Sequence, residues 1–198
     1  MKKKMMLSIV ILFLFGCLTV SAGSVPEDLL QSDEAQIFFA KVIQCETSQD
    51  GIAVELLPVV TVKGDVSLGE QQIYEDVIPI GGFTFSKDKA YLFAYTDEHN
   101  PTYAFRVTNY NPKKLSLIIP EEGRRNMFGR FEEYLNNGDY TVAEADRCVR
   151  LGIQQPAMQL DGELPPLDKG ERSWLPLVVC GAIVLLSAGG LLWWRKKY

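Results

Sequence analysis

Apolar and polar residues alternate along the first half of the chain in runs that are typical of β-strands. The pattern predicts strands at residues 36–44, 51–63, 71–78, 89–96 and 102–108. The first and fourth runs are apolar on both faces, as expected of well-buried central strands. Pro58 interrupts the second run and cannot donate a backbone hydrogen bond, so we expect a bend or bulge there. Five strands joined by short turns close most simply as a small barrel.

The period of the pattern changes after Asn111-Pro112, where helices are expected. Apolar residues recur with helical spacing over residues 121–136; they are Met127, Phe128, Phe131, Tyr134 and Leu135. Thr141 to Glu144 forms a capping-box pattern that predicts a second helix ending at about Leu151. Ser24 and Pro26 suit the first turn of a short helix at about residues 26–32. The sequence thus predicts a mainly β domain with flanking helices, two of them C-terminal.

The N-terminus has the pattern of a secretory signal peptide. Three lysines precede an apolar run at residues 5–15, and Val20-Ser21-Ala22 provides the small residues of a cleavage site. We therefore predict a signal peptide at residues 1–22 and a mature chain that begins at Gly23. Two alternatives remain open at this point: an uncleaved N-terminal anchor, and a lipoprotein signal that ends at Cys17.

Residues 174–194 form an uncharged stretch of 21 residues, which is long enough to cross a bilayer as a helix. Tryptophans stand at both ends, and the basic tail at residues 195–198 favours the cytoplasmic side. This pattern predicts a single-pass protein of the cell membrane with an ectodomain at residues 23–152 outside the cytoplasm. Residues 153–173 are rich in Gln, Pro, Asp, Gly and Glu, and are expected to be a stalk linker. A C-terminal sorting signal removed by a transpeptidase is the alternative for the tail.

The charge of the ectodomain excludes one class of partner. Six of the 20 basic residues lie in the two termini, which leaves 14 against 25 acidic residues and a net charge near −11 for residues 23–173, the ectodomain together with the expected stalk. Such a surface repels phosphate backbones, so we expect no nucleic acid among its partners.

Two of the four cysteines lie in the ectodomain. Cys17 belongs to the predicted signal peptide and Cys180 to the predicted membrane helix, whereas Cys45 and Cys148 would face an oxidising compartment. A disulfide between Cys45 and Cys148 is therefore favoured over two free thiols. It would close a loop of roughly 100 residues and contribute about 4 kcal/mol in the chain-entropy model.

A set of short motifs resembles a known family. Ala35 to Val42, Lys63-Gly64, Gly82, Phe85 and Tyr91 to Ala94 are similar in order and spacing to tissue inhibitor of metalloproteinases and netrin-like domains. The resemblance implies an OB-fold barrel flanked by helices, and the whole chain would then be a five-stranded OB-like barrel with two C-terminal helices and one transmembrane helix.

The sequence departs from this family at the residues that inhibit proteases. Inhibition in the family depends on an N-terminal Cys-x-Cys that chelates the zinc ion of the protease. Here the predicted mature chain starts Gly23-Ser24-Val25-Pro26, and Gly81 stands where a family cysteine usually precedes the glycine that Gly82 matches. The resemblance therefore supports the fold and does not extend to zinc-chelating inhibition.

Titratable residues form no recognisable catalytic or metal-binding set. His99 is the only histidine and lies in an acidic turn, so we expect it to be solvated. The acidic pairs at residues 121–122 and 132–133 suit a helix terminus or a solvent-facing side. The arginines Arg124, Arg125 and Arg130 either receive an acidic partner or, as we favour, form a solvated helix face.

The strand aromatics and the small residues of the predicted membrane helix each have two interpretations. The aromatics are Tyr91, Phe93, Tyr95, Tyr103 and Phe105. They line a binding face on which ligands stack, or they fill the core, which we favour. Gly189 and Gly190 are compatible with close helix packing, although glycine is common in such helices.

The sequence as a whole predicts a membrane-anchored module that acts by binding. We expect no enzymatic activity, no cofactor, and an unknown protein partner outside the cytoplasmic membrane, with an inhibitor-like role as one form of binding. The alternative is a scaffold or accessory subunit of a larger cell-envelope complex that uses its membrane helix as much as its barrel.

Overall fold

A computed structural model describes residues 24–48, 51–97, 100–124, 127–155, 157–159 and 161–170. The chain divides into two units, residues 1–168 and residues 169–198, and the strands and helices described below lie in the first. The predicted signal peptide and the predicted membrane helix at residues 174–194 lie outside the described residues. None of the helices within the described ranges has both the length and the apolar character needed to cross a bilayer.

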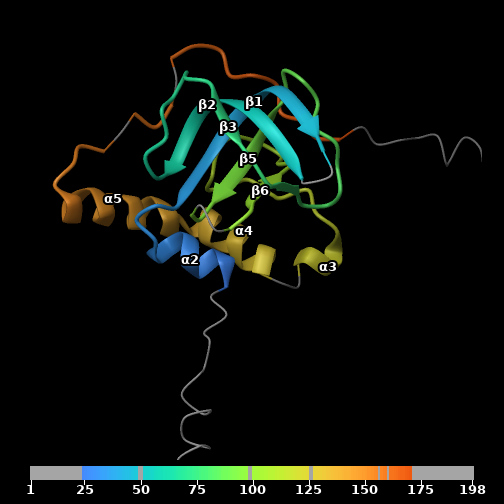
Figure 1. The fold of residues 1–198 in the computed structure, drawn as a ribbon. Coiled ribbons are helices and arrows are strands. Elements are labelled where there is room, and N and C mark those ends of the chain that lie inside the picture. The colour runs from blue at the N-terminus through green and yellow to red at the C-terminus, as the bar shows by residue number, and fades with distance from the viewer. Residues whose placement is uncertain are drawn as a thin grey trace, which may run out of the picture. The chain divides into compact units, whose positions relative to one another are not determined.

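The domain is mainly β, as predicted, and six strands form one curled half-barrel sheet (Figure 1). The strands are β1 (Gln36–Thr47), β2 (Ile52–Lys63), β3 (Gln72–Tyr74), β4 (Val77–Pro79), β5 (Ala90–Tyr95) and β6 (Thr102–Phe105). Their order across the sheet is β3-β2-β1-β5-β6-β4. The helices are α2 (Val25–Gln31), α3 (Glu121–Arg124), α4 (Met127–Asn137) and α5 (Asp139–Leu151).

The strand predicted at residues 71–78 is divided into β3 and β4. Asp76 has a φ of 50°, which turns the chain between the two halves. β3 then pairs with β2 and β4 pairs with β6 in parallel, so one short segment joins the two edges of the sheet. The sequence pattern missed this break because the positive φ falls on an aspartate and not on a glycine.

The bulge predicted at Pro58 is confirmed. Val60 of β2 pairs with Phe39 and Pro58 pairs with Ala40, so Val59 is an extra residue in the ladder. Two similar shifts occur elsewhere between β1 and β2. Because bulges increase local twist, they explain how two strands of 12 residues each follow the curl of the sheet.

The two faces of the sheet have separate apolar cores. The inner core, on the concave side, contains Phe38, Ala40, Val42, Leu56, Tyr91 and Phe93. The outer core contains Ile37, Phe39, Leu92 and Phe105, and continues into α2, α4 and α5 through Leu29, Phe131, Leu135 and Tyr140. The alternation of Ile37 and Phe39 with Phe38 and Ala40 explains why β1 is apolar along both faces.

The helices gather on one side of the strands (Figure 1). Gly138 ends α4 with a φ of 83°, as its place after Asn136-Asn137 predicts, and α5 begins at the next residue. The expected start of α5 at Thr141 is therefore wrong by two residues. Glu144, which the capping-box pattern placed at a helix terminus, instead lies in the body of α5 and is buried.

The segment expected to be a stalk folds back onto the domain. Its residues 157–159 and 161–168, which we call the strap, run across the strands after α5 (Figure 1). The Thr61 N–H donates to the Met158 carbonyl at 2.9 Å, and the Ala90 N–H donates to the Pro166 carbonyl at 3.0 Å. The strap thus satisfies backbone N–H groups of β2 and β5, and the stalk prediction is corrected for these residues.

The predicted disulfide between Cys45 and Cys148 is absent, and both residues are free thiols. Cys45 is exposed on β1 and pairs with Val54 near the start of β2, whereas Cys148 is buried on α5 beside the end of β2. A disulfide needs the two Cα atoms within about 7 Å, and the length of β2 separates these cysteines. The spacing of the cysteines in the sequence carried no information on this distance.

Candidate functional site

A polar cleft opens where the curled sheet brings β3 opposite the first residue of β1 and the last residue of β5. Its volume is about 400 Å³, which is within the range of small-ligand sites. The lining residues are Gln36, Gln72, Ile73, Tyr74, Glu75, Asp76, Tyr95, Asn100 and Thr102. They come from β1, β3, β5, β6, the β3–β4 joint and the β5–β6 turn, so the cleft exists only in the folded domain.

Tyr74 is fixed at the centre of this lining. Its hydroxyl lies 2.8 Å from Gln36 Oε1 and 3.0 Å from Gln72 Oε1. Its ring packs on Phe38 of the inner core at 5.4 Å and meets the edge of Tyr95 at 6.0 Å. Burial raises the pKa of Tyr74, so its hydroxyl stays neutral at physiological pH. The cleft therefore has a rigid aromatic wall held by the core behind it.

Asp76 adopts a backbone conformation that is uncommon for a residue with a side chain. Its φ is 50°, and a Cβ placed on Gly51 would lie only 2.8 Å from Asp76 Oδ1. Gly51 itself has a φ of 146°, which glycine adopts without strain. The fold thus makes room for Asp76 at the rim of the cleft, and strained residues of this kind concentrate at functional sites.

The charge of the lining selects among ligands. Among the described residues that border the cleft, Glu75 and Asp76 are acidic and none is a lysine, arginine or histidine. Phosphate and sulfate groups need cationic or N–H-rich sites, so the cleft is unsuited to anions. The amides of Gln36, Gln72 and Asn100 both donate and accept hydrogen bonds.

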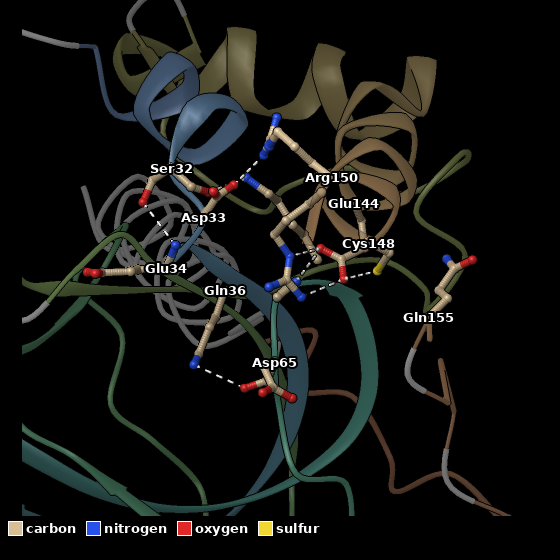
Figure 2. A network of polar contacts seen from close by, with 12 residues as sticks. Ser32, Asp33, Glu34, Gln36, Asp65, Glu144, Cys148, Arg150 and Gln155 are labelled. Atoms are coloured by element: carbon tan, nitrogen blue, oxygen red, sulfur yellow. Dashed lines mark hydrogen bonds and ion pairs between the residues drawn. The ribbon is translucent and has the colours of Figure 1, made fainter. Parts of the chain in front are cut away.

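A second polar cluster lies at the end of β2, and we call it the anchor network; it comprises Lys63, Glu144, Arg147 and Cys148. Figure 2 shows Glu144 and Cys148 projecting from α5 toward the strands. Arg147 donates from Nε to Glu144 Oε2 and from its terminal nitrogen to Oε1, both at 2.9 Å. The Gly64 N–H donates to Glu144 Oε2 at 3.0 Å. All four side chains are buried, so the network is closed to solvent.

Lys63 fastens α2 to the barrel. Its ammonium group donates to the carbonyls of Leu29, Leu30 and Ser32 at the C-terminal end of α2, the last at 2.8 Å. These carbonyls have no partner within the helix, so the lysine caps it. Burial lowers the pKa of Lys63 to about 8, and the nearby Glu144 carboxylate opposes that shift.

Glu144 is held ionised by its partners. Burial alone raises the pKa of this carboxyl, but the hydrogen bonds from Arg147 and Gly64 outweigh it, and the net pKa is lowered. The same pair raises the pKa of Arg147, and burial together with Glu144 raises the pKa of the Cys148 thiol. Each polar group in the network has its partners inside the protein, which is the arrangement of a structural cluster.

The strand aromatics are distributed between core and cleft. Tyr91, Phe93 and Phe105 are buried, as the core interpretation predicted. Tyr103 is partly exposed and packs on Phe128 of α4 at 5.9 Å, and only Tyr95 of the five borders the cleft. Sequence reasoning missed Gln36, Gln72, Tyr74 and Asp76 as cleft residues because they are separated along the chain and share no motif.

The other candidate side chains serve the fold or lie outside the described residues. Arg130 of α4 pairs with Glu27 of α2, so it is not an unpartnered solvated cation. Glu132 accepts a hydrogen bond from the Leu117 N–H at 2.7 Å, which corrects its expected role as a solvent-facing charge. His99 and Arg125 are outside the described residues, and the Arg124 side chain is not described. Within the described ranges, no group of three His, Cys, Asp or Glu side chains is placed to hold a metal ion.

Tyr91 links the inner core to the strap. Its hydroxyl accepts from the Ser86 N–H at 2.8 Å and donates to Asp168 Oδ2 at 2.6 Å. Burial is the main reason that the pKa of Tyr91 rises to about 12. Tyr91 belongs to the run Tyr91 to Ala94 that carries part of the netrin-like resemblance, and its observed role is to hold the C-terminal strap.

The polar cleft is thus an arrangement suited to binding, and the anchor network is suited to holding helices on the sheet. No protein-family model matches the chain, and no curated protein is similar to it in sequence.

Proposed function

We propose that this protein is a membrane-anchored binding module, in which an OB-like, netrin-like barrel outside the cytoplasm presents the polar cleft to a ligand or partner. The observation that carries the proposal is the cleft itself, with its fixed tyrosine wall and its surrounding amides and carboxylates. Preorganised polar groups around a concave site are the ordinary means of selective binding.

The OB-like assignment is supported by the way the sheet curls. A short segment that pairs with β2 through one half and with β6 through the other brings the two sheet edges together, as barrel closure requires. Helices packed on the outer face agree with the netrin-like resemblance. The family's zinc-chelating start is absent from the predicted mature N-terminus, so the binding that we propose does not use it.

The membrane anchor rests on the sequence. The uncharged stretch at residues 174–194, its flanking tryptophans and the basic tail support a single membrane-spanning helix with the tail inside the cytoplasm. The signal peptide at residues 1–22 supports export of the domain. A mass spectrum of the intact protein from membranes tests both, because it should begin at Gly23 and retain Tyr198; a lipidated Cys17 or a missing tail would contradict them.

Binding at the cleft is tested with the full chain in lipid nanodiscs and an envelope extract of the cells that make it. We expect saturable binding that falls roughly tenfold for Tyr95→Ala. Gln155→Ala is the matched control, because Gln155 is exposed and does not border the cleft. Binding that is absent, or that falls equally in both variants, would contradict the proposal.

An accessory subunit remains the second candidate, and one surface favours it. Val142, Val149, Leu151 and Ile153 are exposed apolar residues on α5 or just after it. Exposed apolar residues that gather on one element are typical of protein–protein contacts. Replacing Val142 and Val149 with serine should reduce the size of the complex extracted from membranes, whereas Tyr95→Ala should leave it unchanged.

A further inference from the structure

The polar cleft carries a more specific assignment than binding alone. We infer that its ligand is a neutral, hydroxyl-rich chain, that is, an oligosaccharide. Tyr95 provides the ring on which a sugar stacks, and Tyr74, Gln36 and Gln72 provide hydrogen-bonding groups. This inference rests on the proposed function, since it names the ligand class of the same cleft.

The cleft has hydrogen-bonding capacity that Tyr74 alone does not satisfy. Tyr74 has one hydroxyl hydrogen, yet two amide oxygens lie within hydrogen-bond distance, at 2.8 Å on Gln36 and 3.0 Å on Gln72. One of these oxygens therefore lacks a donor from Tyr74. The Gln36 amide nitrogen is already engaged, because it donates to the Asp65 carbonyl at 3.2 Å. A ligand hydroxyl can supply the missing donor and accept from another group at the same time.

The charge of the lining residues also bears on the ligand class. The lining contains no cationic side chain among the described residues, so an anionic ligand would find no cationic partner there and would be repelled by the carboxylates of Glu75 and Asp76. Both carboxylates are exposed, and an exposed ion pair with a cationic ligand contributes little because solvent and salt screen it. The partly buried amides and tyrosines therefore determine selectivity, and these groups match uncharged hydroxyls.

The shape of the aromatic wall also suits a sugar ring. The rings of Tyr74 and Tyr95 meet at 75°, with their centroids 6.0 Å apart, so they form two walls of a corner. The C–H face of a pyranose ring is apolar and packs on an aromatic ring, while its equatorial hydroxyls point sideways. Glu75, Asp76, Asn100 and Thr102 border the same cleft and offer carboxylate, amide and hydroxyl partners. Carboxylate oxygens accept from adjacent hydroxyls of one sugar ring.

The aromatic side chains of the cleft are also held in place before a ligand binds. Tyr74 is braced by Phe38, which in turn stacks on Phe93 at 5.7 Å within the inner core. β3 and β4 each have only three residues, and both are paired to longer strands. Side chains fixed in this way lose little conformational entropy on binding, which is what weakly attracted neutral ligands require.

The test uses the full chain in lipid nanodiscs, since sugar-based detergents would compete. Chitotetraose, cellotetraose and maltotetraose are titrated by calorimetry up to about 10 mM. We expect at least one to bind, with affinity reduced roughly tenfold by Tyr95→Ala and recovered within about threefold by Tyr95→Phe, which keeps the ring. Gln72→Ala should weaken the same sugar, and Gln155→Ala, on an exposed residue that does not border the cleft, should not.

Three results would overturn the inference: no binding of any tetrasaccharide, binding that Tyr95→Ala leaves intact, or preferential binding of acetylated tetralysine at the cleft. If the sugars fail while the envelope extract still binds in a Tyr95-dependent manner, the ligand class is wrong and the binding module stands. If both fail, the proposed function fails as well.

Discussion

Two groups of polar side chains border the same barrel and have opposite surroundings. The anchor network at the end of β2 is closed, and each of Lys63, Glu144 and Arg147 is at most 5% exposed and has partners within the protein. The polar cleft at β3 is open, and its amides, carboxylates and tyrosines surround about 400 Å³ of space.

This difference separates polar groups that hold the fold together from polar groups that are available to a ligand. A buried charge costs folding free energy unless it is paired, so the network stabilises the fold only while all of its members are present. Polar groups around an open cleft are solvated in the free protein, so removing one changes binding more than folding. Each prediction below tests one side of this comparison, from the largest expected effect to the smallest.

The largest effect is expected for Glu144→Gln. The change leaves the buried Arg147 cation without its carboxylate, and breaking a buried pair costs about 3–5 kcal/mol of unfolding free energy. Urea unfolding of the full chain measures this loss. Asp33→Asn is the matched control, because it breaks the exposed Arg150–Asp33 pair and should cost less than about 1 kcal/mol. Equal losses would show that the network is not the anchor we describe.

Lys63→Met should change how stability depends on pH. The folded pKa of Lys63, about 8, lies below its ordinary value of 10.5. Between these values the unfolded chain keeps a proton that the folded chain has released, so the unfolding free energy of the natural protein rises with pH. Relative to Lys63→Met, the natural protein should gain about 2 kcal/mol from pH 8 to 10. Parallel pH profiles for the two proteins would contradict this assignment.

Tyr91→Phe should loosen the strap without altering the cleft. It removes the hydrogen bonds to Asp168 and Ser86, and each such bond contributes about 1 kcal/mol. Limited proteolysis should cut residues 157–168 faster in this variant. Tyr95→Phe serves as the control, and unchanged cleavage in Tyr91→Phe would show that the backbone bonds at β2 and β5 suffice to hold the strap.

Thr61→Val should stabilise the domain slightly. Thr61 is 4% exposed, and its hydroxyl is buried without a hydrogen-bond partner among the described residues. Valine has nearly the same shape, so the change removes the cost of an unsatisfied group and should raise the unfolding free energy by about 1 kcal/mol. A destabilised Thr61→Val protein would indicate that the Thr61 hydroxyl has a hydrogen-bond partner in solution. The control is Val60→Thr, the reverse change at the neighbouring residue.

The sequence predicted the elements better than it predicted how they meet. The strand signal in β1, β2 and β5 was strong because each strand packs on a core, and Pro58 marked a real bulge. The break at Asp76 was missed because a positive φ outside glycine leaves no mark in an apolar pattern. The strap looked like a linker from its Pro and Gly content, although Leu164 and Leu167, which pack on the outer core, were the available signal.

The candidate site was harder to predict for a physical reason. The capping-box pattern placed Glu144 at a helix terminus, and only the fold shows its buried pair with Arg147, three residues further along the same helix. The cleft residues come from four strands and two turns, so only the curl of the sheet brings Gln36 to Tyr74. Of the cleft residues, only Tyr95 was among the five strand aromatics considered for a binding face, and core filling was the favoured interpretation for that set.

Hydrogen–deuterium exchange of the full chain, with and without the envelope extract, tests the comparison most directly because it observes both regions at once. We predict added protection at residues 72–79 and 91–97, which include the cleft, and no change at residues 59–66 or 139–151, which contain the anchor network. Tyr95→Ala should abolish the added protection. Protection that appears at the anchor network instead, or that persists in Tyr95→Ala, would contradict the assignment of binding to the cleft.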